Sequence, residues 1–119
     1  MIVEGQVHGG ICDGIGLALM ERVAFDAEGN CLSASLMDYL IPTALEVPDW
    51  ETGTTVTPSP HHPLGAKGVG ESPNVGSPPA IVNAVIDALH QTHGVDHVDM
   101  PCTPARVWRA MQGNAEPPQ

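Results

Sequence analysis

The first clear pattern in the chain is a stripe of apolar residues at helical spacing near the N-terminus. The side chains that share this spacing are Val7, Ile11, Ile15, Ala18 and Leu19, and they predict a helix over residues 7–22. Four glycines interrupt this segment, and each disfavours a helix by about 1 kcal/mol relative to alanine. Because such glycines usually allow a close approach, we expect the helix backbone to contact another surface or a ligand.

The next segments have the alternation and turn residues of short strands. Residues 22–25 and 31–35 flank a turn that contains Gly29, which predicts a β-hairpin. The threonine- and valine-rich run at 51–57 and the run at 95–100 predict two further strands. Between them, residues 36–48 are apolar but irregular and are broken by prolines.

The C-terminal half predicts a long loop and then two helices. Residues 58–79 are rich in glycine and proline and carry little charge, which favours an ordered functional loop. Ser77 is the expected N-cap of a helix over 78–92, which Gly94 ends. A last helix starts at Thr103-Pro104, and residues 113–119 are expected to form a disordered tail. The whole pattern predicts an α+β fold with mixed short strands and one long helix in the C-terminal half.

Composition and charge exclude several classes of protein. The chain has 119 residues, enough for one domain or a piece of a larger one. Its net charge of −10 argues against binding to nucleic acid or to an anionic membrane surface. No apolar run is long enough for a transmembrane segment, and no basic leader marks a signal peptide. Three cysteines without a CxxC pair argue against a disulfide framework or zinc ribbon and favour a reducing cytoplasm.

One glutamate stands out as a candidate catalytic residue. Glu71 follows a glycine-rich loop that also holds Lys67, the single lysine of the chain. Glycines let the backbone approach a bound group closely, and a carboxylate enclosed there can act as a base near neutral pH. The alternative from spacing alone is a solvated loop glutamate. The loop lacks the Gly-Lys-Ser/Thr ending of a P-loop, although its amides could form an anion-binding nest.

The remaining candidate residues carry weaker signals. Gln6 precedes the glycine-rich helix and could hydrogen-bond a ligand, or it could be an ordinary surface residue. His61 and His62 are adjacent, so in an extended loop they point apart, and no carboxylate or cysteine lies at ligand spacing. The sequence therefore predicts no metal site. The cysteines are expected to be small buried hydrophobes.

Two motifs together resemble those of a known family, the molybdenum hydroxylases, which include xanthine dehydrogenase and aldehyde oxidase. The stretch Gly65-Ala66-Lys67-Gly68-Val69-Gly70-Glu71 resembles the family's Gly-x-Lys-Gly-x-Gly-Glu loop. The stretch Gly5-Gln6-Val7-His8-Gly9-Gly10 is similar to its Gly-Gln-x-x-Gly-Gly segment. Residues 36–44 and 50–63 look like the large subunits of the family's aerobic carbon-monoxide dehydrogenase branch. Many relatives carry glutamine where this chain has Asp13.

The resemblance implies a fold, an activity and site residues. Residues 1–119 would be a single C-terminal fragment of a molybdopterin-binding domain, and the parent enzyme would oxidise carbon monoxide with water to carbon dioxide. Glu71 would be the base or proton manager, and Gln6 would hydrogen-bond the molybdenum–pterin centre. Lys67, Gly68 and Gly70 would shape the pocket. The implied cofactor is molybdopterin cytosine dinucleotide.

The resemblance also implies partners, and two alternatives stay open. Copper, FAD and [2Fe-2S] clusters would lie elsewhere in the complex. The partners would be the rest of the large subunit and the FAD-binding and iron–sulfur subunits, in the cytoplasm or held through partners at the inner membrane face. One alternative is a sibling hydroxylase that acts on an aldehyde or N-heterocycle. The other is a truncated remnant without catalysis, and in either case the isolated chain is expected to be inactive.

Overall fold

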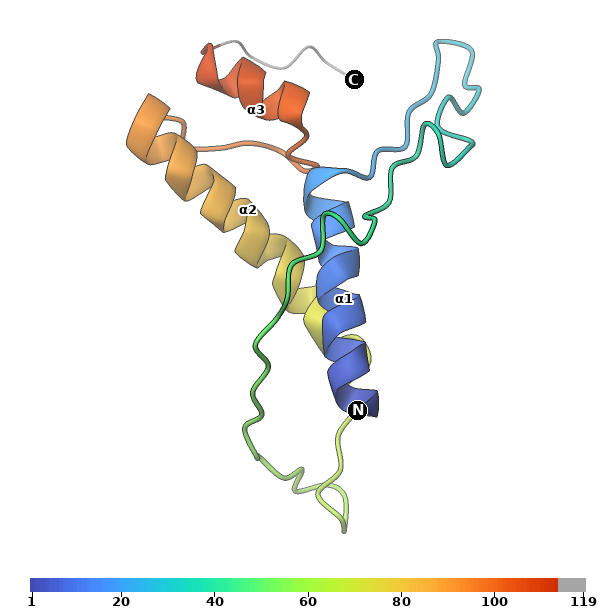
Figure 1. Ribbon diagram of the computed structural model, residues 1–119, viewed down its shortest axis with the longest axis vertical. Helices are drawn as coiled ribbons and strands as arrows, with labels where there is room; N and C mark the ends of the chain where they lie inside the picture. The colour runs from blue at the N-terminus through green and yellow to red at the C-terminus, as the bar shows by residue number, and fades with distance from the viewer. Residues whose placement is uncertain (114–119) are drawn as a thin grey trace.

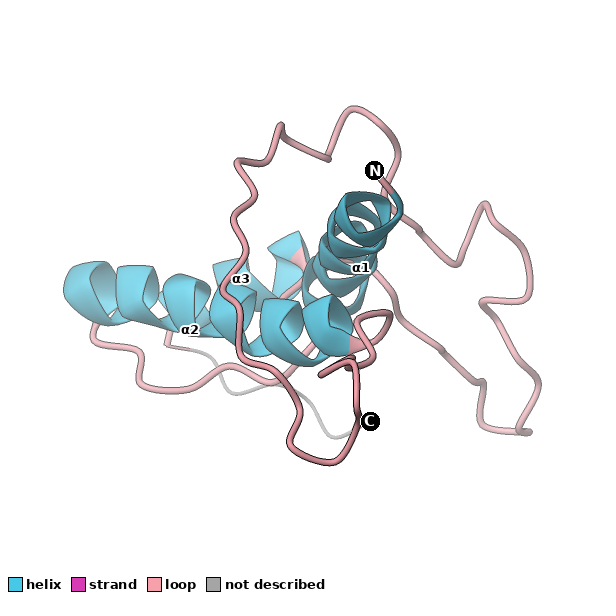
Figure 2. Ribbon diagram, turned by 90° about the horizontal axis from the view of Figure 1, so that it is seen from below, coloured by secondary structure: helices cyan, strands magenta, loops and turns pink. Residues whose placement is uncertain are grey.

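The fold is built from three helices joined by long irregular segments. The computed structural model describes residues 1–113, in which the helices are α1 (Ile2–Leu19), α2 (Ser72–His93) and α3 (Pro104–Met111). Helices α1 and α2 lie against each other near the start of α2 and diverge toward its C-terminal end, where α3 follows (Figure 1). Figure 2 shows the two long segments that leave the helices as loops. Part of the predicted tail, residues 114–119, lies outside the described residues.

Two glycines of α1 explain why this helix tolerates so many of them. A Cβ atom on Gly10 would lie 2.5 Å from Asn74 Oδ1 and 2.7 Å from Pro73 Cβ. A Cβ on Gly14 would lie 2.6 Å from the Cβ of Ser77. The backbones of α1 and α2 therefore approach too closely for any side chain at these two positions. The predicted close approach is correct, although α1 begins at Ile2 and ends at Leu19 rather than spanning 7–22.

Helix α2 confirms the predicted helix at 78–92 but begins earlier. Its N-cap is Glu71, so Ser77 lies inside the helix, and Pro78 and Pro79 are interior residues. The Ser77 hydroxyl donates to the carbonyl of Pro73 at 2.7 Å and to the carbonyl of Gly10 at 3.2 Å. Packing against α1 thus extends the helix across two prolines that usually mark a helix start. Gly94 ends the helix with φ 66°, as predicted.

The predicted strands are wrong for the described residues. Residues 1–113 contain no strand, and the predicted hairpin is reduced to one antiparallel bridge between Phe25 and Cys31. The amide of Leu32 still donates to the carbonyl of Ala24 at 2.7 Å. A two-stranded hairpin without a further strand to pair with is marginal, and neither 51–57 nor 95–100 supplies that strand. The described chain is therefore helical with long loops, not α+β.

A small core joins the C-terminal elements to α1. Leu89 of α2 packs with Val98 and Cys102, and half-buried residues of all three helices cover them. The amide of Cys102 donates to the carbonyl of Ala18 at 2.6 Å, which fastens the segment before α3 to the end of α1. Thr103 caps α3 by accepting a hydrogen bond from the amide of Arg106, as the Thr-Pro sequence predicts.

The chain has far more exposed surface than a self-contained domain of its size. Its accessible surface is 8763 Å² at 12.4 kDa, whereas a monomeric protein of this mass exposes about 6,100 Å². Its radius of gyration is 17.8 Å, compared with about 13.5 Å for a compact domain of this length. Large apolar side chains such as Met37 (89% exposed) and Leu45 (93% exposed) face solvent. No helix in residues 1–113 is long and apolar enough to cross a membrane.

Candidate functional site

The fold brings the two glycine-containing motifs of the sequence together. Gln6 lies on the second turn of α1, and Glu71 is the N-cap of α2. A Cβ on Gly70 would lie 3.3 Å from Nε2 of Gln6, so the Gln6 amide lies against the backbone next to Glu71. Residues 65 positions apart in the chain thus form one site at the end of the α1–α2 pair.

The glycine loop presents its polar groups to the outside. The side chains of Lys67 and Glu71 are exposed, and Gly68 has no atom within 4 Å of the position where a Cβ would lie. Within residues 1–113, no hydrogen bond or ion pair involves the side chains of Gln6, Lys67 or Glu71. The expected enclosure of Glu71 is therefore not provided by this chain alone. The loop supplies an exposed cation and an exposed carboxylate, and α1 supplies the Gln6 amide beside them.

The backbone of Glu71 belongs to the first turn of α2. Its φ and ψ angles are −93° and −12°, and its carbonyl accepts a hydrogen bond from the amide of Val75 at 3.2 Å. The amide of Ser72 donates to the carbonyl of Val69 at 3.2 Å. Glu71 therefore lies where the glycine loop ends and helix α2 begins.

Two polar contacts that the sequence did not reveal hold the first two turns of α2 against α1. Asn74 Nδ2 donates to Asp13 Oδ2 at 2.5 Å, and the Ser77 hydroxyl donates to the carbonyl of Gly10. The sequence contained one indication of these contacts. Gly10 and Gly14 are four residues apart and so mark one face of α1 as a contact face, but they do not identify the segment that packs against it.

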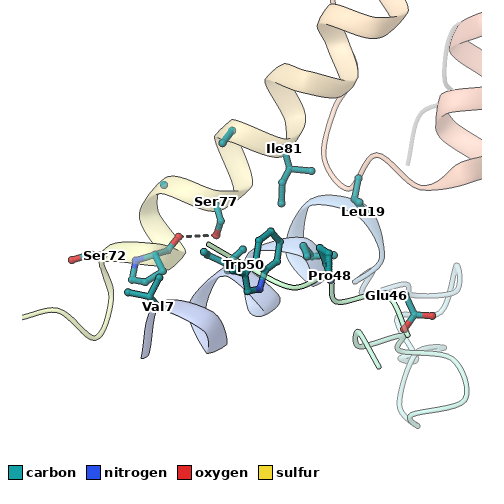
Figure 3. Close-up of a pocket in the computed structure, with 13 residues that line it drawn as sticks. Val7, Leu19, Glu46, Pro48, Trp50, Ser72, Ser77 and Ile81 are labelled. Carbon is teal, nitrogen blue, oxygen red and sulfur yellow. Dashed lines mark hydrogen bonds between the residues drawn. The ribbon is translucent and has the colours of Figure 1, made fainter. Parts of the chain in front are cut away.

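An apolar groove runs between α1, α2 and the segment 46–50. It encloses about 740 Å³, and Figure 3 shows Trp50 and Pro48 above α1 with Ile81 and Leu19 facing them. A second apolar hollow of about 670 Å³ continues from it toward α3 and shares Ile15 and Leu19. The apolar residues that line the first groove are Val7, Ile11, Ile15, Leu19, Pro48, Trp50, Pro73, Ala80 and Ile81.

A smaller hollow of about 380 Å³ shares Pro48 and Trp50 with the first groove. It is lined by His8 and Cys12 among others, and His8 Nε2 and Trp50 Nε1 are buried without a hydrogen-bond partner in the described chain. Unpaired buried polar atoms are unfavourable in a finished structure. They indicate a surface that normally meets further polar groups.

The cysteines and histidines form no further reactive cluster. Cys102 is buried, and its burial raises the pKa of the thiol. Cys12 is half-buried and Cys31 is exposed, so the prediction of a buried hydrophobe is wrong for Cys31. Within residues 1–113, no group of three or more histidine, cysteine or acidic side chains could hold a metal ion.

Comparison with known proteins agrees with this geometry. Residues 1–48 match the molybdopterin cofactor-binding domain family. The carbon monoxide dehydrogenase large chain of Hydrogenophaga pseudoflava is 56% identical over 112 residues, which are 94% of this chain and 14% of that one.

Two solved structures have the same arrangement. A structure of a Cu,Mo-CO dehydrogenase superposes with a TM-score of 0.89 at 50% identity over 95% of this chain and 14% of that chain. Quinoline 2-oxidoreductase from Pseudomonas putida 86 superposes with a TM-score of 0.90 at 47% identity over 97% of this chain and 14% of that chain. The chain therefore belongs to the molybdenum hydroxylase family and corresponds to a segment of its large, molybdopterin-binding subunit.

Proposed function

We propose that this chain is part of the molybdenum cofactor-binding catalytic subunit of an oxidoreductase that oxidises carbon monoxide with water to carbon dioxide. The observation that carries the proposal is the close approach of the Gln6 amide to the backbone at Gly70, beside Glu71. It occurs in a chain that is 56% identical to a carbon monoxide dehydrogenase large chain. The chain spans 14% of the length of that relative, so activity belongs to an assembled enzyme.

The side chains at the site fit a pterin-bound metal group. The Gln6 amide can both donate and accept a hydrogen bond, and Lys67 adds a positive charge. The open backbone at Gly68 leaves room for a bulky ligand, and a side chain at Gly70 would press against the Gln6 amide. When bound, the molybdenum cofactor supplies two-electron redox chemistry. We propose the molybdopterin cytosine dinucleotide form.

Each residue then has a specific task. The Gln6 amide binds the cofactor, and Lys67, Gly68 and Gly70 shape the wall of the pocket. Glu71 accepts a proton at its carboxylate oxygens as water is consumed and releases it to solvent. The overall reaction converts carbon monoxide and water into carbon dioxide, two protons and two electrons. [2Fe-2S] and FAD groups on partner subunits would take up the electrons, and another part of the large subunit would hold copper.

The surface of this chain supports the proposed partners. Its accessible area exceeds that of a typical monomer of the same mass by about 2,600 Å², which is the area of a large permanent interface. The two apolar grooves and the unpaired atoms of His8 and Trp50 are the surfaces that the rest of the large subunit would cover. We place the assembled enzyme in the cytoplasm.

A second candidate is a hydroxylase for an N-heterocycle or aldehyde. The TM-score of 0.90 to quinoline 2-oxidoreductase favours it, because the same segment serves an enzyme named for an N-heterocycle. Glu71 would again act as the base. Hybrid enzymes that carry this chain in the carbon monoxide dehydrogenase large chain and in quinoline 2-oxidoreductase separate the two candidates by which host keeps its turnover. Loss of turnover in both hosts would favour a non-catalytic remnant.

The test is a hybrid enzyme in which this chain replaces the matching segment of the Hydrogenophaga pseudoflava large chain. We expect the hybrid enzyme to bind molybdenum and to reduce a dye with carbon monoxide. Glu71→Gln keeps the shape of the side chain but removes its basicity, so turnover should fall about 100-fold or more with normal molybdenum content. Glu28→Gln, an exposed glutamate in the turn at 26–30, is the matched control. Turnover of the Glu71→Gln enzyme near that of the control would refute the role.

Gln6→Ala tests binding separately from proton transfer. Removal of a hydrogen bond to a buried cofactor group weakens binding by about 1–3 kcal/mol. The hybrid enzyme with this change should therefore contain less molybdenum per protein, measured by elemental analysis. Full molybdenum content together with full turnover would exclude Gln6 from cofactor binding.

A further inference from the structure

The hydrogen bond between Asp13 and Asn74 connects two parts of the chain that local structure leaves independent. The two residues are 61 positions apart, and Asn74 Nδ2 lies 2.5 Å from Asp13 Oδ2. A carboxylate can only accept, so the nitrogen of the Asn74 amide must face Asp13. The other amide atom, Oδ1, is buried without a partner in the described chain, which leaves the contact with Asp13 as the one that orients this side chain.

The hydrogen bond between Asp13 and Asn74 attaches the first turn of α2, which follows Glu71, to α1. Asn74 is the third residue after Glu71, and the first hydrogen bond of α2 runs from the amide of Val75 to the carbonyl of Glu71. One helical turn therefore links the Asn74 side chain rigidly to the Glu71 backbone. On α1, Asp13 is rigidly connected to Gln6 through the same helix.

Within residues 1–113, no hydrogen bond of the glycine loop joins Glu71 to α1. The backbone hydrogen bonds at 59–65 are local, with Ser59 bonded to Gly65 and Gly65 bonded to His62. Gln6 Nε2 lies 3.3 Å from the position that a Cβ of Gly70 would take, and no hydrogen bond joins the two residues in the described part of the chain. The position of Glu71 relative to Gln6 therefore depends on how α2 is attached to α1.

We infer that Asp13 and Asn74 are a positioning pair that sets the place of Glu71 opposite Gln6. This inference rests on the proposed function of Glu71, which acts on a ligand held by Gln6. The hydrogen bond from the Ser77 hydroxyl to the carbonyl of Gly10 attaches the next turn of α2 to α1 as well. The pair touches no reacting group and acts only through the first turn of α2.

The test exchanges the donor and the acceptor in the hybrid enzyme. Asn74→Asp places two carboxylates against each other, and their repulsion opposes the contact. An aspartate near a helix N-terminus is otherwise favourable, so a loss would come from the pair and not from α2 itself. The double variant Asp13→Asn with Asn74→Asp restores one donor and one acceptor with their positions reversed.

A second Asp–Asn pair in the chain provides the matched control. Asn30 Nδ2 donates to Asp26 Oδ2 at 2.9 Å in the exposed turn at 26–30. The same two changes, Asn30→Asp and its combination with Asp26→Asn, alter the same chemistry away from Glu71. Neither change should affect turnover.

We expect Asn74→Asp to lower kcat about 10-fold or more, because displacement of a reacting group by about 1 Å can slow a reaction by up to about 100-fold. KM and molybdenum content should stay near their original values. Hydrogen exchange of the amides at 69–76 should become faster in Asn74→Asp, and the double variant should recover both exchange protection and kcat to within about threefold.

Three results would overturn the inference. One is an Asn74→Asp enzyme with unchanged exchange and unchanged kcat. Another is faster exchange with unchanged kcat, which would make the pair structural only. The third is a double variant that regains neither property although it assembles and binds molybdenum. Full turnover of the Glu71→Gln enzyme would refute the proposed function of Glu71 and not the Asp13–Asn74 pair. Hydrogen exchange of the amides at 69–76 would still show whether the pair stabilises the first turn of α2.

Discussion

Replacement of Gly14 by alanine tests whether the α1–α2 contact holds the site together. The new Cβ would lie 2.6 Å from the Cβ of Ser77 and 3.1 Å from Cδ of Pro78, whereas carbon atoms in contact prefer about 3.5–4.0 Å. The helices must therefore separate by roughly 1 Å at this point. Overpacking of this kind costs about 1–3 kcal/mol, and loss of the Ser77–Gly10 hydrogen bond adds about 1 kcal/mol.

The intrinsic preference of alanine for a helix offsets part of this loss. It contributes about 1 kcal/mol, so Gly14→Ala should lower the free energy of unfolding by about 1–3 kcal/mol. Gly9 of the same helix has no atom within 4 Å of a Cβ position. Gly9→Ala should therefore stabilise the chain by about 0.5–1 kcal/mol and serves as the matched control.

The assay is thermal unfolding of the full chain followed by far-ultraviolet circular dichroism. A change of 1 kcal/mol corresponds to a shift of roughly 4 °C in Tm for a chain of this size. The two variants should thus shift Tm in opposite directions. Equal shifts for both alanines would refute the close packing of α1 on α2, since only helix propensity would then be acting.

Three further predictions concern the C-terminal core. Arg106 is buried, and its Nη1 donates to the carbonyls of Met100 at 2.6 Å and Pro101 at 3.3 Å. Arg106→Ala should therefore lower the free energy of unfolding by about 2–3 kcal/mol, while the exposed Arg109→Ala should change it little in the same melting experiment. Burial raises the pKa of the Cys102 thiol, so Cys102 should react with a thiol reagent at least 10-fold more slowly than exposed Cys31. The Cys102 thiol ionises at lower pH in the unfolded chain than in the folded chain, so the free energy of unfolding should fall as pH rises above about 8.5. Cys102→Ala should lack this part of the fall. An equal pH dependence of the free energy of unfolding in both proteins would contradict the raised pKa of Cys102.

The sequence alone predicted those features that depend on neighbouring residues. The apolar stripes predicted α1 and most of α2, and Gly94 and Thr103 predicted a helix end and a helix start correctly. Helical periodicity and capping are local properties, so they can be recognised without the rest of the fold. The glycines of α1 also indicated a close contact, although not its partner.

The predicted strands failed because a strand needs a partner that its own sequence does not contain. Residues 22–35 have the alternation of a hairpin, yet only Phe25 and Cys31 form a bridge. The start of α2 was misplaced for a related reason. Ser77 and Pro78 have the local pattern of a helix start, but the hydrogen bond from Ser77 to Gly10 belongs to the packing of two helices.

The candidate site likewise has features that the sequence revealed and features that only the structure revealed. Its residue types were visible in the sequence, because Gln6 and Glu71 lie in two glycine motifs whose joint occurrence is distinctive. Their proximity and the Asp13–Asn74 bond that spans α1 and α2 came only from the tertiary structure. A contact between residues 61 positions apart depends on the path of the whole intervening chain, and no local pattern of hydrophobic and polar residues specifies that path.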